Sequence, residues 1–185
     1  MPENFKVICT GNPKVPGIAQ AISHFYPDCC FISRSSGFDL TTSESLKRFS
    51  EIVNDYNVFI NNSQVVPGTQ SKLLDIINKN WSAGHVFTVG SIAEYTRWED
   101  FDPLYTREKR DLREQSLNMC NEYLKTTHLI VGGFNDLGPN TLDRMDPLKI
   151  AEAINWILQN DVHIPLLGIE KITHAKTAHW KKNNK

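Results

Sequence analysis

Short apolar segments that lack any alternation with polar residues recur along the chain, and a helical pattern separates each from the next. The strand-like segments are 5–10, 29–32, 58–60, 85–89, 128–131 and 164–169, with a brief extended piece at 37–40. Helical periodicity is found at 18–25, 42–54, 69–81, 103–125 and 146–158. Strands that are apolar on both faces are typical of sheets covered on both sides. The pattern therefore predicts an α/β chain whose doubly wound parallel sheet lies between two helical layers, in a three-layer α/β/α arrangement.

The bulk properties favour one domain without a macromolecular or membrane partner. The 185 residues suffice for a single core, which we expect at 1–172, followed by a basic tail at 173–185. A net charge of -1 gives no general attraction to nucleic acid, and no apolar run approaches the ~20 residues of a membrane span. The start of the chain has no signal-peptide pattern, and the four cysteines include no C-x-x-C pair. We therefore expect a cytoplasmic protein with free thiols and no metal site.

The loop that follows the first strand carries glycines at two informative positions. Gly11 ends the strand, and Gly17 precedes the helix that begins at Ile18. Glycines at such positions let a pyrophosphate approach the backbone amides at the positive end of a helix. The loop therefore favours a dinucleotide-binding Rossmann fold, although an ordinary strand–helix turn would explain these residues equally well in isolation.

Tyr105 and Lys109 stand four residues apart in the predicted helix 103–125, so they share one helix face. An ammonium group held beside a phenol favours the tyrosinate and lowers the tyrosine pKa from its free value of about 10. Such a pair is a usable proton donor or acceptor near neutral pH. Ser91 follows the strand 85–89 and precedes Tyr105 by fourteen residues, and its hydroxyl is suited to polarising a substrate carbonyl.

Further segments resemble the short-chain dehydrogenase/reductase family, in that family's chain order. Residues 61–63 end a strand and read N-N-S, similar to the family's N-N-A-G, while Asp39-Leu40 resembles its adenine-contacting acidic and aliphatic pair. Residues 130–133 resemble the loop after its sixth strand, and 146–154, D-P-L-K-I-A-E-A-I, resemble its final helix. Gly11 and Gly17 fit its T-G-x-x-x-G-x-G loop, with Val15 at the middle glycine.

The resemblance implies an NAD(P)-dependent oxidoreductase that moves hydride between the nicotinamide and a carbonyl or alcohol substrate. It implies Tyr105 as general acid/base, Ser91 as its partner at the carbonyl, and Lys109 as the residue that binds the nicotinamide ribose. It also makes a homodimer plausible. The positions expected to bind the cofactor are Gly11, Lys14, Gly17, Ile18, Arg34, Asp39, Leu40, Asn61, Asn62, Ser63, Tyr105, Lys109 and Gly133.

The choice between the two nicotinamide dinucleotides follows from charge. An acidic residue at the end of the second strand would bind a ribose 2′-hydroxyl and repel a phosphate, but Ser33 stands there and Arg34 follows it. Lys14 adds a second cation in the first loop. Two cations without a carboxylate favour the 2′-phosphate of NADP over NAD, unless both are solvated surface charges.

The chain departs from the family pattern at two places. The segment between Asn62 and Ser91 is short, and no asparagine stands where the family's catalytic one would; Val65 or a neighbour occupies that place, with Asn62 as a candidate substitute. In the loop after 128–131, Gly132 replaces a proline and Leu137 replaces a threonine, for which Thr141 is a candidate. Val15 in the first loop and the missing asparagine support the alternative function, a catalytically silent NAD(P)-binding sensor or scaffold.

Overall fold

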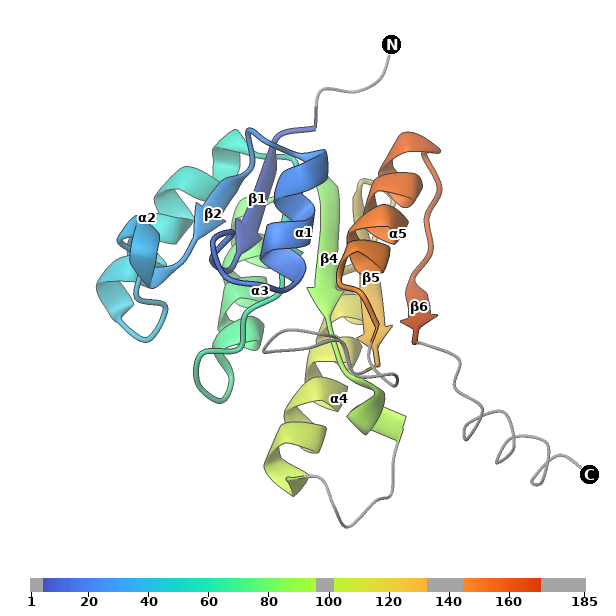
Figure 1. Cartoon of the computed structure of the whole chain (residues 1–185). Helices are drawn as coiled ribbons and strands as arrows, with labels where there is room; N and C mark the ends of the chain where they lie inside the picture. Colours follow the sequence, from blue (N-terminus) through green and yellow to red (C-terminus); the bar gives the residue numbers. More distant parts are fainter. Residues whose placement is uncertain (1–4, 96–101, 133–144, 171–185) are drawn as a thin grey trace, which may run out of the picture.

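The computed structural model describes residues 5–95, 102–132 and 145–170, and its elements alternate between strand and helix (Figure 1). The strands are β1 (Val7–Thr10), β2 (Cys30–Ile32), β3 (Val58–Asn61), β4 (Gly84–Val89), β5 (Leu124–Val131) and β6 (Leu166–Ile169). The α-helices are α1 (Ile18–Phe25), α2 (Ser43–Ile52), α3 (Thr69–Asn80), α4 (Pro103–Met119) and α5 (Leu148–Gln159). Three short 3₁₀ turns are η1 (Arg34–Ser36), η2 (Val53–Asp55) and η3 (Ile92–Tyr95).

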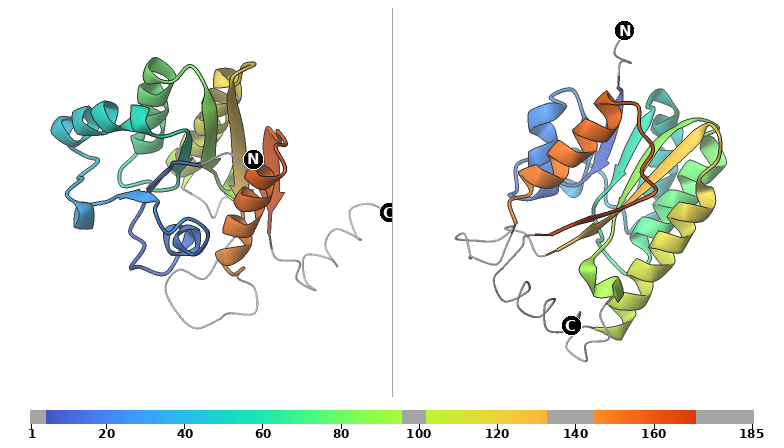
Figure 2. Two further views of the ribbon diagram at one scale, coloured as in Figure 1. Left: turned by 90° about the horizontal axis from the view of Figure 1, so that it is seen from above. Right: turned by 90° about the vertical axis from the view of Figure 1, so that its right-hand side faces the viewer.

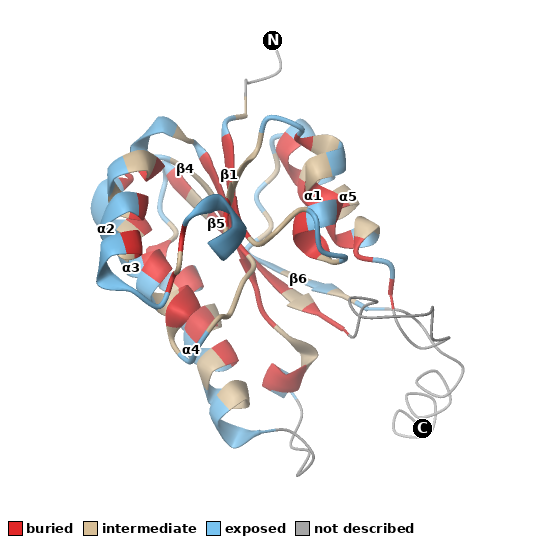
Figure 3. Cartoon of the chain, turned by 60° about the vertical axis from the view of Figure 1, so that its left-hand side comes forward, coloured by how far each residue is buried: buried red, intermediate tan, exposed pale blue. Residues whose placement is uncertain are grey.

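Within the described residues the strands form one parallel sheet in the order β2-β1-β3-β4-β5-β6. Helices α1 and α5 cover one face, while α2, α3 and α4 cover the other (Figure 2). Buried residues follow the strands and the inward faces of the helices (Figure 3). The predicted three-layer α/β/α fold with a doubly wound parallel sheet is confirmed, and the apolar strands are apolar because a helical layer covers each face.

Two elements differ from the sequence prediction. Helix α4 ends at Met119, not near residue 125, because the Asn121 Oδ1 atom accepts from the amides of Tyr123 and Leu124, both at 2.9 Å, and turns the chain into β5. Residues 37–40 form no strand: Gly37 has a φ of 82° and ends η1. The side chains of Phe38 and Leu40 are nevertheless buried there.

Within the described residues, no helix combines the length and apolarity needed to cross a bilayer. Nor does any group of three or more His, Cys, Asp or Glu side chains in these residues form a possible metal site. The predicted basic tail lies outside the described residues.

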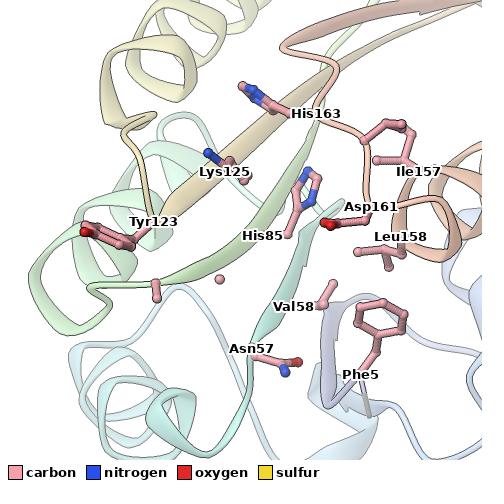
Figure 4. Close-up of a pocket in the computed structure, with 13 residues that line it drawn as sticks. Phe5, Asn57, Val58, His85, Tyr123, Lys125, Ile157, Leu158, Asp161 and His163 are labelled. Atoms are coloured by element: carbon pink, nitrogen blue, oxygen red, sulfur yellow. The ribbon is translucent and has the colours of Figure 1, made fainter. Parts of the chain in front are cut away.

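A cavity of about 420 Å³ lies at the amino-terminal ends of the strands, where His85, Asp161 and Leu158 line it (Figure 4). The His85 ring stacks on Phe87, and its Nε2 atom lies 2.9 Å from Thr127 Oγ1. Burial, reinforced by the positive charges of His163 and Lys125, lowers the pKa of His85 to about 4. Below pH 6.5 the unfolded chain therefore takes up a proton at this residue that the folded chain refuses.

We predict that the free energy of unfolding falls by about 2 to 3 kcal/mol on account of His85 as the pH drops from 6.5 to 4. His85→Gln keeps a group that can bond to Thr127 and should flatten this part of the pH profile. Urea denaturation at half-unit pH steps measures it. His24→Gln is the control, because His24 is exposed and its loss should leave the slope intact. A slope unchanged in the His85 variant would contradict the assignment.

Candidate functional site

The opposite edge of the sheet, at the carboxyl ends of β1 and β3, is the topological switch point of the fold. Strand β1 pairs with β2 on one side and β3 on the other, so the two halves of the chain wind away from this edge in opposite directions. Parallel α/β sheets bind ligands at such a crevice. The buried Thr10 closes it from below, since its Oγ1 atom accepts from the amides of Asn62 (2.8 Å) and Ser63 (2.9 Å).

A cavity of about 290 Å³ opens at this crevice and gathers four of the predicted cofactor residues. It is lined by Gly11, Asn12, Ile32, Ser33, Arg34, Ser35, Phe38, Leu40, Ser63 and Val65. Gly11 has a φ of 134°, and a Cβ there would lie 2.7 Å from the Cβ of Ala19, so no other residue fits. Val15 is 48% exposed and is not part of the lining, so its side chain does not fill the place of the missing glycine.

The turn after β2 supplies the polar wall of the cavity. Its hydroxyls are linked, with Ser33 Oγ 2.8 Å from Ser35 Oγ, and the exposed Arg34 sits between them. Asp39 lies outside the lining, and its carboxylate is already hydrogen-bonded: it accepts from the hydroxyl (2.7 Å) and the amide (3.1 Å) of Thr41. These bonds, with a smaller effect of the Arg34 charge, lower the pKa of Asp39. Among the residues that the structure describes, the cavity lining thus contains a cation and hydroxyls but no carboxylate.

The remaining predicted cofactor residues differ in what they present. Gly17, with a φ of 145°, is the N-cap of α1 and provides no side-chain cap, which leaves the first helical amides available to an anion. Ile18 belongs to the core by its side chain, and Lys14 is exposed beside the loop. Asn61 is buried and donates to the Gln70 carbonyl at 2.8 Å, so its side chain faces away from the cavity. Gly133 lies outside the described residues.

Helix α4 carries the Tyr105 and Lys109 pair as the spacing predicts. The Lys109 ammonium lies 5.5 Å from the centre of the Tyr105 ring. Lys109 is only 5% exposed, and its Nζ atom donates to Gln70 Oε1 at 2.6 Å and to the Val89 carbonyl at 3.1 Å. Burial lowers the pKa of Lys109 to about 8, against the opposing effect of the Glu94 and Glu108 carboxylates. An ammonium with a pKa in this range loses its proton within the pH range of ordinary enzymes.

Ser91 stands directly beyond β4, in a turn that is fastened to α4. Its hydroxyl oxygen accepts from the Ala93 amide at 3.2 Å, which leaves the hydroxyl proton for another acceptor. Arg110 Nε on α4 donates to the Glu94 carbonyl at 2.7 Å, and Lys109 bonds to Val89, two residues before Ser91. The helix that carries Tyr105 and the turn that carries Ser91 are therefore tied at two points.

Comparison with known proteins identifies the fold. No family model matches the chain, and no curated protein matches its sequence. Among solved structures, it is similar to an apo SCOR enzyme from Clostridium thermocellum, with a TM-score of 0.72 at 15% identity over 92% of this chain and 96% of that one. It is also similar to RhlG from Pseudomonas aeruginosa, solved as an active-site complex with NADP (TM-score 0.68, 14% identity, 91% and 96% covered). A dehydrogenase/reductase from Sinorhizobium meliloti gives a TM-score of 0.71 at 13% identity (89% and 93% covered).

The chain has the short-chain dehydrogenase/reductase fold. The resemblance predicted from its motifs is thereby confirmed at the level of architecture, at a sequence identity of 11–15% to the similar structures.

Three buried residues that the sequence did not single out support this candidate site: Gln70, Glu94 and His128. Glu94 Oε1 accepts from the Ser91 amide at 2.8 Å and lies 3.0 Å from His128 Nε2. The His128 Nδ1 atom lies 2.7 Å from Thr88 Oγ1, whose hydroxyl donates to Ser116. The His128 ring is therefore held from both sides, by Glu94 and by Thr88. The spacing Ser91-x-x-Glu94, which is typical of a capping box, was the available signal.

The Glu94 carboxylate and the His128 ring form a buried pair that packs against the backbone of the turn at Ser91. Both side chains are fully buried, and Arg113 NH1 lies 3.6 Å from Glu94 Oε2, which has no hydrogen-bond partner among the described residues. A Cβ at Gly90 would lie 2.1 Å from Glu94 Oε1 and 2.3 Å from His128 Nε2, so glycine is required there. Breaking such a pair leaves a buried charge without compensation.

We predict that Glu94→Ala lowers the free energy of unfolding by about 3 to 5 kcal/mol, because it strands the buried His128 ring and the Ser91 amide. Glu94→Gln keeps an acceptor for both and should cost clearly less. Urea denaturation at pH 7 measures both changes. Glu114→Ala, an exposed position on α4, is the control and should change little. A Glu94→Ala chain as stable as this control would contradict the structural role.

Proposed function

We propose that this chain is an NAD(P)-dependent oxidoreductase that transfers hydride between the nicotinamide and a small carbonyl or alcohol substrate. The observation that carries the proposal is the position of two features at the same edge of the sheet: the cavity walled by Gly11, Arg34 and Leu40, and the Tyr105–Lys109 pair. Structural similarity to proteins solved with NADP supports the cofactor class.

The proposed roles follow from the side chains at this edge. The adenosine half would occupy the cavity, with the pyrophosphate at the start of α1 beside Gly17. The nicotinamide would supply or accept the hydride. Lys109 would bind its ribose beside Tyr105, whose hydroxyl would exchange a proton with the substrate oxygen while the Ser91 hydroxyl donates to it.

NADP is the preferred form in this proposal. The cavity lining contains a guanidinium and two linked serine hydroxyls, and the nearby Asp39 carboxylate is engaged by Thr41. A 2′-phosphate would therefore meet donors and a positive charge. The first experiment is titration of the purified chain with NADPH and NADH by calorimetry. Micromolar binding that favours NADPH supports the proposal, whereas no binding of either cofactor would overturn it.

The alternative is a catalytically silent NAD(P)-binding sensor or scaffold. Its two sequence arguments were Val15 in the first loop and the missing asparagine. The exposed position of Val15 weakens the first, and the hydrogen bond of Gln70 to Lys109 weakens the second. Cofactor binding without turnover of any compound in a broad carbonyl and alcohol panel would favour the silent reading.

We predict that Tyr105→Phe lowers turnover of any active carbonyl substrate by at least about 100-fold while NADPH affinity stays within a few-fold. The reason is that the phenol hydroxyl carries the proton, whereas the ring only borders Lys109. Steady-state kinetics and NADPH fluorescence titration measure the two effects. Tyr123→Phe is the matched control, since Tyr123 is 67% exposed at the opposite end of the sheet. Full activity in the Tyr105 variant would exclude Tyr105 as the acid/base.

We predict that Arg34→Ala weakens NADPH binding by about tenfold or more and leaves NADH binding nearly unchanged, because only NADPH carries the 2′-phosphate. Parallel titrations with both cofactors give the ratio. Lys47→Ala, which removes an exposed cation from α2, controls for the change in net charge. Equal losses for the two cofactors would mean that Arg34 does not contact the phosphate.

A further inference from the structure

Gln70 lies at the point where α3, β3, β4 and α4 meet, and it is only 4% exposed. Its Nε2 atom donates to the carbonyls of Asn61 (2.8 Å) and Val89 (3.1 Å), which are the last residues of β3 and β4. The backbone carbonyl of Gln70 accepts from the Asn61 side-chain amide at 2.8 Å. Gln70 is thus hydrogen-bonded to the ends of both strands, independently of its contact with α4.

These bonds determine which way the amide faces. With Nε2 held by two backbone carbonyls, Oε1 is directed at α4, where it accepts from Lys109 Nζ at 2.6 Å. The reversed amide would place its own N–H groups against the ammonium and lose both carbonyl bonds. The orientation is therefore set by the strands, and through it the strands set the position of the lysine head group.

In the described part of the chain, the Lys109 ammonium has two hydrogen-bond acceptors. An ammonium has three N–H donors, and two are used by Gln70 Oε1 and the Val89 carbonyl. The charged groups that act on it are Glu94 from η3 and Glu108 from α4 itself. The Tyr105 ring lies 5.5 Å away on the same helix, while α3 contributes the neutral Gln70 and β4 a backbone carbonyl. Gln70 Oε1, at 2.6 Å, is the nearer of these two acceptors, since the Val89 carbonyl lies at 3.1 Å.

We propose that Gln70 is the positioning residue of this site, which holds Lys109 beside Tyr105 and, as a neutral acceptor, sets the pH at which that lysine gives up its proton. The catalytic meaning of this assignment rests on the proposed oxidoreductase function. In the sequence, no asparagine stands at the place the family pattern would require, and Asn62 bonds to the Thr10 carbonyl at 3.2 Å. Gln70 occupies the contact to Lys109 directly.

The choice of an amide over a carboxylate has a chemical consequence. A carboxylate at position 70 would pair with the ammonium and keep it charged to high pH, whereas an amide stabilises the charge less. A thioether would offer no comparable acceptor. Substitutions at this one position are therefore expected to move the Lys109 titration in opposite directions, which a purely structural role would not do.

The test follows the Lys109 Hε–Cε resonance with pH in protein that carries ¹³C-labelled lysine, assigned by its loss in Lys109→Met. Gln70→Met should lower the pKa of Lys109 by about one unit, and Gln70→Glu should raise it by about one unit or more. Gln115→Met is the matched control: Gln115 also joins α4 to α3, through the Ser71 carbonyl and Asp75, but does not bond to Lys109. That variant should titrate as the unaltered chain does.

Opposite shifts in the two Gln70 variants, with the pH midpoint of turnover moving the same way, are the expected result. An unchanged Lys109 titration in a folded Gln70→Met or Gln70→Glu chain would overturn the proposal. The NMR titration needs no cofactor or substrate, so it gives its answer even if the chain fails to bind NADPH. Failure of the proposed function would appear separately, as absent binding in the unaltered protein.

Discussion

The burial of one ammonium group, that of Lys109, constrains the rest of the site. A charge placed at this depth is tolerated only where acceptors surround it. The chain provides them by bringing the ends of two strands and the start of α3 together around the lysine, through Gln70 and the Val89 carbonyl. The same bonds fix α4 against the sheet and so place Tyr105. The bonds that pack α4 against the sheet therefore also position Tyr105, the proposed acid/base.

A second buried charge supports the neighbouring turn, and the two are linked. The Glu94 Oε1 atom accepts from the Ser91 amide and lies at hydrogen-bond distance from the His128 ring. The backbone carbonyl of Glu94 accepts from Arg110 of α4. Its charge also raises the pKa of Lys109, opposing the effect of burial. Removing Glu94 would thus act on Ser91 directly and on Lys109 at a distance. Natural sites commonly hold such costly groups where chemistry requires them.

The sequence predicted those parts of the structure that local pattern determines. The apolar strands gave the sheet, and the four-residue spacing gave the Tyr105–Lys109 pair. The end of α4 was missed because the Asn121 side chain bonds to the amides of Tyr123 and Leu124, which a periodicity argument does not weigh. Gln70 was missed because a glutamine in the first turn of a helix usually faces solvent. Its partners, Asn61, Val89 and Lys109, come from three other elements that only the fold brings together.

The segment after η1, which forms no strand, shows how the fold keeps the cavity in which we propose that the cofactor binds. Residues 37–40 add no strand beyond β2, yet Phe38 and Leu40 line the cavity, because Gly37 in its left-handed conformation returns the chain toward the sheet. The Phe38 amide donates to the Ser33 carbonyl at 2.9 Å, and Arg48 of α2 donates to the Gly37 carbonyl at the same distance. A turn stabilised by these bonds therefore places Phe38 and Leu40 as the apolar side of the cavity without a further strand. The cavity therefore depends on where side chains are placed at the ends of β1 and β2, and the number of strands beside them is secondary.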